Sequence, residues 1–323
     1  MSIDPGTSPA ESPNTDSPNA PFHLTAEQLA FYDDNGYLVL PGRIPADMLD
    51  RLRTAGEHWM SAGRGMDGVE GGDDYRFADR PSGRVMFRVD YVHDKGEPAS
   101  LELLGSPEIL GIAESLVGPN FVPTYEAMVF KDAGDGAPIH WHQDAVHPRT
   151  SRIANVDIYL DASIADAGAL RVIPGSHRQA ADICTLEEAH GWNIPGAIEV
   201  PLEPGDVLLH DVMIVHGSPP AVGKKLRRTI YYEFRAAEQI FDQGPWDAEW
   251  VDRRLRLLPL ALAEHASARP DVRQFEWTPD ETLRPQPAPD RADELRIIHV
   301  GHTPGSYCSA GSADPAAVPT ATS

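Results

Sequence analysis

Short apolar stretches separated by turns dominate the middle of the chain, from Phe121 to about residue 236. Two of them, residues 156–160 and 207–209, are rich in β-branched residues and leucine and are too short for typical globular helices. Pro-Gly pairs, which favour turns, occur at 174–175 and 204–205. Because short apolar stretches between turn signals are typical of strands, this region is predicted to form a β-rich core.

Three stretches outside this core have the periodicity and the end signals of helices. The first begins after Thr25, where Gln28 can complete a capping box. The second begins near Pro45, and its apolar face is formed by Met48, Leu49, Leu52 and Trp59. The third covers residues 107–117, with a proline in its first turn and Gly118 at its C-terminal end.

These segments indicate one folded domain, residues 22–302, with a tail at each end. Both tails are rich in small and polar residues and bury too little apolar surface to fold, so we expect them to be disordered. The parts of the chain are therefore a tail (1–21), a helical N-terminal part (24–118), the β-rich core (about 121–236), a mixed C-terminal extension (about 237–302) and a second tail (303–323).

Composition narrows the classes of partner and the compartment. The chain has 323 residues and a formal net charge of −22, which argues against nucleic acid and anionic membrane surfaces as partners, because these require clustered lysines and arginines. Two cysteines, Cys184 and Cys308, are too few for a disulfide framework, and no apolar stretch is long enough to span a bilayer. No secretory signal is visible, so we expect a reduced, cytoplasmic protein of unknown oligomeric state.

The most informative chemistry lies in one motif, His140-Trp141-His142-Gln143-Asp144. If this motif is a strand, alternation places the side chains of His142 and Asp144 on one face, where both can reach one metal ion. A third candidate ligand, His216, lies in the apolar segment 208–218. Two histidines and one carboxylate form the facial triad of non-haem Fe(II) oxygenases, which leaves coordination positions open. A His-x-Asp pair alone more often forms a surface hydrogen bond, so the prediction depends on its surroundings.

Several further motifs follow in the order and spacing of one enzyme family. Over residues 24–235 the chain resembles the phytanoyl-CoA dioxygenase family, a branch of the Fe(II)/2-oxoglutarate oxygenases that includes ectoine hydroxylase-like enzymes. The resemblance implies a double-stranded β-helix, the cupin-like jelly roll of two facing sheets, with helices packed outside the larger sheet. The motifs that carry it are Asp34-Asn35-Gly36-Tyr37, Trp141-His142-Gln143-Asp144, residues 168–177, Pro204-Gly205-Asp206, and His216-Gly217-Ser218 followed by Arg227.

The resemblance also implies a reaction. His142, Asp144 and His216 would bind Fe(II), and 2-oxoglutarate and O2 would be the co-substrates, with succinate and carbon dioxide released. Related halogenases replace the carboxylate ligand by a small residue, so Asp144 predicts hydroxylation, desaturation or ring chemistry at an unactivated C–H bond. The substrate is expected to be a small metabolite of natural-product or amino-acid-like metabolism, since no basic cluster suited to a CoA phosphate is seen.

The co-substrate requires a cation at its far end. Its distal carboxylate would be buried, and the planar fork of an arginine is the best partner for a buried carboxylate. Arg227 follows His216 by eleven residues, where the family places that arginine. The neighbouring Arg228 would point to the opposite face of a strand and form a salt bridge elsewhere. The resemblance also places Lys131 and Ser218 near the co-substrate.

Substrate contacts follow less directly from the sequence, and each candidate has an ordinary alternative as a surface or packing residue. Some lie on strands that should line the cavity, and others lie in polar segments near its mouth. His140 also competes with His142 as a ligand, but the family pattern selects His142. His210 is interpreted as a packing or hydrogen-bonding residue. The candidates for substrate binding are Tyr125, His140, Asp157, Tyr159, Arg88 and Arg152.

Two other functions are compatible with these motifs. A jelly-roll enzyme with Fe(II) or Mn(II) could use the same ligands without 2-oxoglutarate. Loss of 2-oxoglutarate binding in Arg227→Ala, with metal binding retained, would argue against it. The other alternative is a non-catalytic jelly-roll protein with a structural metal. Structural sites are usually closed by four protein ligands, so three ligands favour catalysis.

Overall fold

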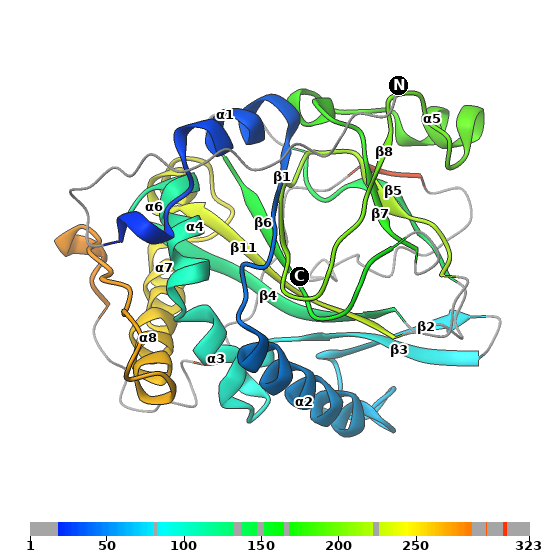
Figure 1. Ribbon diagram of the computed structural model, residues 1–323. Coiled ribbons are helices and arrows are strands. Elements are labelled where there is room, and N and C mark those ends of the chain that lie inside the picture. The colour runs from blue at the N-terminus through cyan, green and yellow to red at the C-terminus, as the bar shows by residue number, and fades with distance from the viewer. Residues whose placement is uncertain are drawn as a thin grey trace.

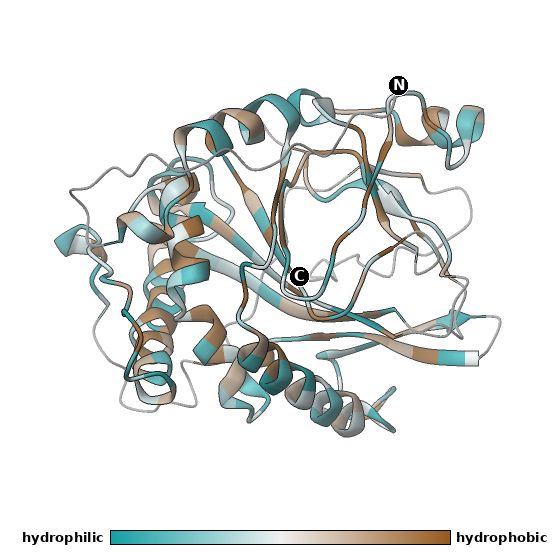
Figure 2. Cartoon of the chain, in the orientation of Figure 1, coloured by the Kyte–Doolittle hydropathy of each residue, from teal (hydrophilic) through white to brown (hydrophobic). Residues whose placement is uncertain are grey.

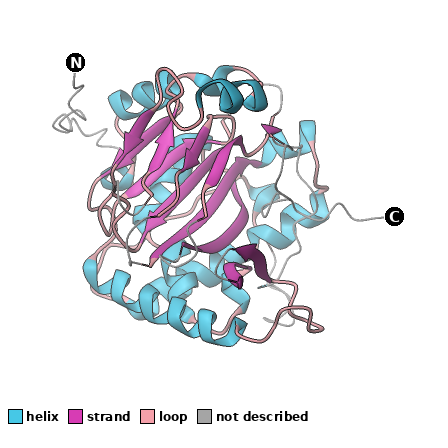
Figure 3. Cartoon of the chain, turned by 90° about the vertical axis from the view of Figure 1, so that its right-hand side faces the viewer, coloured by secondary structure: helices cyan, strands magenta, loops and turns pink. Residues whose placement is uncertain are grey.

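Two antiparallel sheets face each other at the centre of the protein, with helices on the outside (Figures 1 and 3). The computed structural model describes residues 19–80, 83–131, 137–146, 152–164, 168–221, 226–285, 295 and 306–308. Most of the two predicted tails, 1–18 and 309–323, therefore lies outside the described residues. The predicted jelly roll is confirmed.

The larger sheet, here called the major sheet, has seven strands in the order β1-β9-β6-β11-β4-β3-β2. Its strands are β1 (Tyr37–Leu40), β2 (Tyr75–Arg80), β3 (Gly83–Asp90), β4 (Phe121–Lys131), β6 (Ala154–Tyr159), β9 (Val207–Asp211) and β11 (Arg227–Ala236). The smaller sheet, here called the minor sheet, has five strands in the order β12-β5-β10-β7-β8. Its strands are β5 (Ile139–Gln143), β7 (Leu170–Val172), β8 (Ile198–Val200), β10 (His216–Ser218) and β12 (Ser306–Tyr307).

Strand β11 shows how alternation divides the major sheet into two faces. Ile230, Tyr232 and Phe234 are fully buried in the large apolar core that the sheet shares with the helices. Residues at the alternate positions, such as Thr229 and Tyr231, face the minor sheet. Figure 2 shows hydrophilic and hydrophobic residues mixed along the strands of this sheet. The face toward the minor sheet, here called the inner face, is therefore available for chemistry.

A smaller apolar cluster joins the two sheets at one end. It is formed by buried side chains from β6, β7, β8 and β9 and from the segments after β8 and before β10, namely Tyr159, Leu170, Val172, Val200, Leu202, Leu208 and Ile214. This cluster fixes the separation of the sheets on one side.

Most helices cover the outer face of the major sheet, whereas α5 packs against β5 and β12 of the minor sheet (Figure 1). The helices are α1 (Ala26–Asn35), α2 (Ala46–Gly63), α3 (Pro98–Leu104), α4 (Pro107–Val117), α5 (Ile183–His190), α6 (Ala237–Gln243), α7 (Ala248–Leu255) and α8 (Leu257–Ala268). The C-terminal extension thus supplies α6, α7 and α8. Among the described residues, no helix has the length and apolar character needed to cross a bilayer.

The three helices predicted from end signals are confirmed. Thr25 caps α1, and the capping box with Gln28 forms in both directions. The predicted apolar face of α2 is buried, and α4 begins at Pro107 and ends before Gly118. The N-terminal part is less helical than predicted, because β1, β2 and β3 also lie within residues 24–118 and extend the major sheet.

The predicted N-terminal tail, residues 1–21, extends too far into the folded region. Residues 20–22 form a 3-10 helix, and Asn19 before it is buried. The Asn19 amide donates to Glu114 on α4 at 3.2 Å and to the carbonyl of Glu276 at 3.0 Å. These partners are distant in sequence, so composition alone did not reveal that Asn19 is held.

The C-terminal end also corrects two expectations. Residues 306–307, inside the predicted tail 303–323, form β12 and pair with β5. Cys308 then forms a disulfide with Cys184 in α5, with a Cα–Cα separation of 4.6 Å. The expectation of two reduced cysteines is therefore not met, because strand pairing brings together two residues that are 124 positions apart.

Candidate functional site

The three predicted metal ligands come together at the minor sheet. His142 on β5 and His216 on β10 are cross-strand partners, and their ring centroids are 4.1 Å apart. Asp144 follows β5 directly, with its Oδ1 3.3 Å from Nε2 of His142 and its Oδ2 3.8 Å from Nε2 of His216. One donor atom from each residue lies within 4.8 Å of the others, which is a suitable arrangement for one metal ion.

The orientation of both imidazole rings fits a metal site. Nδ1 of His142 lies 2.7 Å from the carbonyl of His140, and Nδ1 of His216 lies 3.0 Å from the carbonyl of Ile214. A ring whose Nδ1–H is donated to a carbonyl presents its Nε2 lone pair as the metal-binding atom. In both residues Nε2 is the atom that faces Asp144.

The protonation states also favour metal binding. Burial, helped by the nearby His142, lowers the pKa of His216 to about 3, so its ring is neutral at neutral pH. Burial alone would raise the pKa of Asp144, but the imidazoles of His216 and His142 outweigh burial and hold that pKa below its usual range. A neutral imidazole and an ionised carboxylate are the forms that coordinate divalent metals. Two nitrogens and one carboxylate oxygen match the facial triad of non-haem iron.

Two residues of the major sheet reach toward the ligand carboxylate. Asn155 on β6 donates from Nδ2 to Oδ2 of Asp144 at 2.9 Å, and Nδ1 of His210 on β9 lies 3.9 Å from the same oxygen. Nε2 of His210 is 3.2 Å from Asp157, and this carboxylate outweighs burial and raises the pKa of His210 to about 9. The hydrogen-bonding interpretation of His210 is consistent with this geometry. Asn155 was not identified from the sequence, although it alternates with Asp157 and Tyr159.

A basic cluster, here called the basic pocket, is formed by Lys131 and Arg227 around Ser218, two residues along β10 from His216. Lys131 and Arg227 are cross-strand partners on β4 and β11, and both are almost fully buried. Nζ of Lys131 donates to Oγ of Ser218 at 2.6 Å, and Nη1 of Arg227 lies 3.5 Å from the same hydroxyl. The structure therefore brings together the three residues that the sequence placed near the co-substrate.

Arg227 is held by uncharged groups. Its Nη1 donates to Oγ of Ser163 at 3.1 Å and to the carbonyl of Gly168 at 2.5 Å, and these two residues were not identified from the sequence. Within the described part of the chain, no carboxylate forms an ion pair with Arg227. A buried guanidinium without a carboxylate partner is costly, so this pocket is suited to an anionic ligand.

The adjacent arginine has a different role. Arg228 forms a two-point ion pair with Asp161, with Nε to Oδ2 at 2.8 Å and Nη2 to Oδ1 at 2.9 Å. Its side chain also contacts the outer face, since its Nη1 donates to the carbonyl of Arg53 in α2 at 3.3 Å. The prediction that Arg228 points away from the site and forms a salt bridge is confirmed.

Four of the candidate substrate residues lie on the inner face. Hydroxyl Oη of Tyr125 donates to Asp90 at 2.9 Å, and Nε of Arg88 is 2.9 Å from the same carboxylate, so these two residues form one cluster. Asp157 is paired with His210. The hydroxyl of Tyr159 is buried and finds no hydrogen-bond partner among the described residues.

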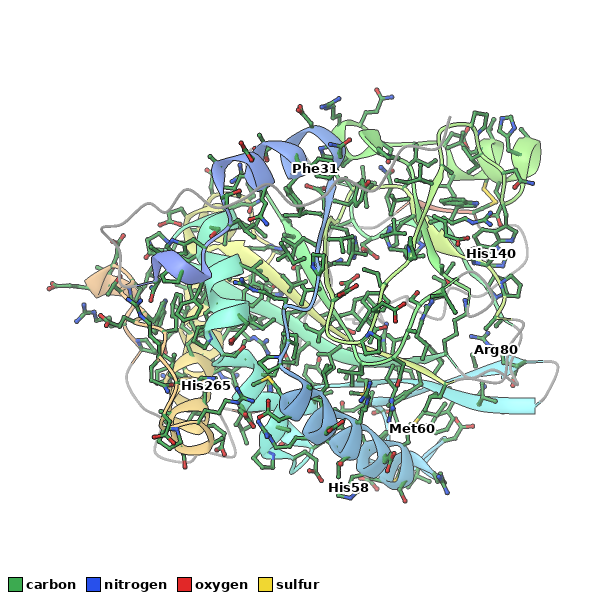
Figure 4. The ribbon with its side chains drawn as sticks, in the orientation of Figure 1. Phe31, His58, Met60, Arg80, His140 and His265 are labelled. Carbon is green, nitrogen blue, oxygen red and sulfur yellow. A yellow bond between two sulfur atoms is a disulfide. The ribbon has the colours of Figure 1, made fainter. Side chains whose placement is uncertain are left out.

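The two other candidates are not brought to the site. His140 is largely exposed, and its Nδ1 is 2.6 Å from Glu187 on α5 (Figure 4). Arg152 forms a two-point ion pair with Asp33 on α1, with both distances 2.7 Å. In each case a charged partner from a distant part of the chain turns the side chain away from the metal ligands.

Comparisons with known proteins find dioxygenases among the similar proteins. The dioxygenase lolE1 of Epichloe uncinata is 27% identical over 221 residues, which is 64% of this chain and 81% of that protein. A probable alpha-ketoglutarate-dependent hypophosphite dioxygenase of Stutzerimonas stutzeri is 26% identical over 233 residues, which is 67% of this chain and 80% of that protein.

A solved structure has the same fold. The crystal structure of EctD from S. alaskensis with 2-oxoglutarate and 5-hydroxyectoine superposes with a TM-score of 0.56 at 22% identity, covering 70% of this chain and 79% of that chain.

The family model described as phytanoyl-CoA dioxygenase (PhyH) matches residues 32–229, a range that contains all three ligands and Arg227. The chain therefore belongs to the phytanoyl-CoA dioxygenase family of iron- and 2-oxoglutarate-dependent dioxygenases.

Proposed function

We propose that this enzyme hydroxylates an unactivated C–H bond of a small metabolite, with Fe(II) bound by His142, Asp144 and His216 and with 2-oxoglutarate bound at its far carboxylate by Arg227. The main support is the way β10 links the two sites. His216 begins this strand, and Ser218 two residues later contacts the basic pocket. Two strand residues span roughly 7 Å, a distance comparable with the length of a five-carbon dicarboxylate.

The metal ligands and the residues of the basic pocket would have separate roles. Three protein ligands leave three positions of an octahedral metal open, which is enough for a bidentate 2-oxo acid and for dioxygen. Bound iron would supply the oxidising chemistry that no side chain has. Arg227 would pair with the distal carboxylate, and Lys131 would hold Ser218 in place beside it.

The inner face supports a small, partly polar substrate. Tyr125, Val129, Tyr231 and Asn155 are partly accessible, whereas their neighbours along the same strands are mostly buried. This wall is aromatic and polar, which suits a compact metabolite with hydrogen-bonding groups. Retention of the carboxylate ligand Asp144 supports hydroxylation over halogenation.

A visible spectrum tests this proposal directly. Fe(II) and 2-oxoglutarate are added to the purified protein without oxygen, and we expect a weak charge-transfer band from the chelated co-substrate. Candidate metabolites are then screened by succinate release on admission of oxygen. Iron binding without the band would favour a jelly-roll metal enzyme that does not use 2-oxoglutarate.

Gly168 offers a separate test of the basic pocket. Its φ is +67°, and a Cβ added there would lie 2.4 Å from the carbonyl oxygen of Pro219 and 2.8 Å from Nζ of Lys131. Gly168→Ala should therefore lower the unfolding free energy by more than the roughly 1–2 kcal/mol that a left-handed alanine costs. It should also weaken 2-oxoglutarate binding, measured by titration of the charge-transfer band.

Gly196 provides the matched control. Its φ is +85°, but an added Cβ meets nothing within 4 Å. Gly196→Ala should lower the unfolding free energy only by the cost of a left-handed alanine and should leave 2-oxoglutarate affinity unchanged. Equal affinities in the two variants would show that the close packing around Gly168 does not shape the co-substrate pocket.

A further inference from the structure

The two oxygens of the Asp144 carboxylate have different surroundings. Oδ1 is the oxygen nearer to His142, with a distance of 3.3 Å to Nε2. Oδ2 instead accepts a hydrogen bond from the Asn155 amide at 2.9 Å. Oδ2 also lies 3.8 Å from Nε2 of His216. Because the Asn155 amide already binds Oδ2, Oδ1 is left as the oxygen for the metal and Oδ2 is the oxygen held by the protein.

The group that holds Oδ2 is part of the opposite sheet. Asn155 on β6 and His210 on β9 are cross-strand partners on the inner face of the major sheet. Nδ1 of His210 also lies 3.9 Å from Oδ2, and its Nε2 is 3.2 Å from Asp157. The ligands belong to β5, its end and β10, so this pair reaches across the space between the sheets.

We propose that Asn155 is a positioning residue that keeps Asp144 monodentate by occupying Oδ2. The proposal rests on the proposed function, since its consequence concerns the positions that 2-oxoglutarate and dioxygen require. Two imidazoles and a monodentate carboxylate leave three of six positions open, whereas a bidentate carboxylate leaves two. A bidentate 2-oxo acid would fill both of these and leave no position for dioxygen.

The chemistry of an amide suits this role. An amide donates a hydrogen bond to the free oxygen of a ligand carboxylate without adding positive charge near a divalent cation. A lysine or arginine at the same place would also hold Oδ2, but its charge would oppose metal binding. Asn155 is only half-buried and has no other described partner, so its removal does not empty the apolar core.

Asn155→Leu tests the proposal, because leucine has a similar size and no donor. If Asn155 keeps Asp144 monodentate, metal affinity measured by calorimetry with Co(II) should stay within about threefold of the wild type or become tighter. The succinate formed per enzyme when the Fe(II) and 2-oxoglutarate complex meets oxygen should fall by roughly 10–100-fold, the usual effect of losing a group that supports a ligand. A role that is merely structural would instead reduce metal affinity and succinate formation together, and that result would overturn the proposal.

A second measurement needs no co-substrate. Infrared difference spectra of the protein with and without Co(II) report the separation of the two carboxylate stretching bands, which narrows when a carboxylate becomes bidentate. We expect this narrowing in Asn155→Leu and in Asn155→Ala, which loses the same donor without added bulk. An unchanged separation in folded variants would refute the assignment. The infrared measurement does not depend on 2-oxoglutarate. If the wild-type protein gives no 2-oxoglutarate band, the proposed function fails, and the role of Asn155 at the metal is still tested separately.

Asn120 provides the matched control. It is a buried asparagine immediately before β4, and its Nδ2 also donates to carboxylates, those of Glu238 and, at 2.9 Å, Asp280. Asn120→Leu should lower stability while leaving metal affinity, the carboxylate bands and succinate formation unchanged. A similar loss of succinate formation in both variants would attribute the effect to general destabilisation and contradict the proposal.

Discussion

Asp144→Ala is expected to remove iron binding and, with it, all 2-oxoglutarate-dependent activity. Two histidines alone hold a divalent metal poorly, and loss of a ligand should exceed the 10–100-fold cost of losing a group that only supports one. We therefore expect metal affinity to fall by more than about 100-fold, measured by calorimetry with Co(II). The fold should survive, because Asp144 is partly accessible and the released Asn155 amide can be hydrated.

Asp206→Ala is the matched control for this prediction. Asp206 is a buried aspartate that accepts from the backbone N–H of Gly42 at 2.8 Å and of Glu203 at 2.9 Å, away from the ligands. Its loss should lower the unfolding free energy by roughly 1.5–3 kcal/mol per charged hydrogen bond and leave metal affinity unchanged. Wild-type metal affinity in Asp144→Ala would mean that the metal binds elsewhere and that the triad assignment is wrong.

Arg227→Met should abolish 2-oxoglutarate binding at ordinary concentrations while iron still binds. Removal of one partner of a buried ion pair costs about 3–5 kcal/mol, because the remaining charge is left buried and unpaired. This corresponds to a loss of affinity of between two and four orders of magnitude, at about 1.4 kcal/mol for each tenfold change. The dissociation constant is obtained by titrating the anaerobic charge-transfer band.

The neighbouring arginine separates this effect from general damage. Arg228 is paired with Asp161, so Arg228→Met should reduce stability and leave the 2-oxoglutarate dissociation constant within about threefold of the wild type. If Arg228→Met weakens 2-oxoglutarate binding as strongly as Arg227→Met does, the distal carboxylate is not bound specifically by Arg227.

The metal site was predictable because it depends mainly on local sequence. Alternation around β5 places His142 and Asp144 together, although Asp144 lies just past the end of the strand. The third ligand, His216, lies in a separate apolar segment. The family pattern selected His142 over His140 and supplied the residues of the basic pocket. Helix ends at Thr25 and Gly118 were equally local, because capping signals lie within a few residues of the helix end.

What the sequence did not reveal depends on contacts between distant segments. His140 was expected near the substrate, but Glu187 holds it at the surface. Arg152 is held by Asp33 in the same way. The contact between Asn155 and Asp144 requires the two sheets to face each other in one particular alignment. No local pattern encodes that alignment.

The two faces of β11 restrict how this protein can vary. Arg227 and Tyr231 belong to the inner face, while Ile230 and Tyr232 belong to the apolar core with the helices. Insertion or deletion of one residue within the strand would exchange these faces, sending the arginine toward the helices and apolar side chains toward the iron. Single inner-face residues of β11 can therefore be substituted without disturbing the apolar core, but changes in chain length must occur in the loops between strands.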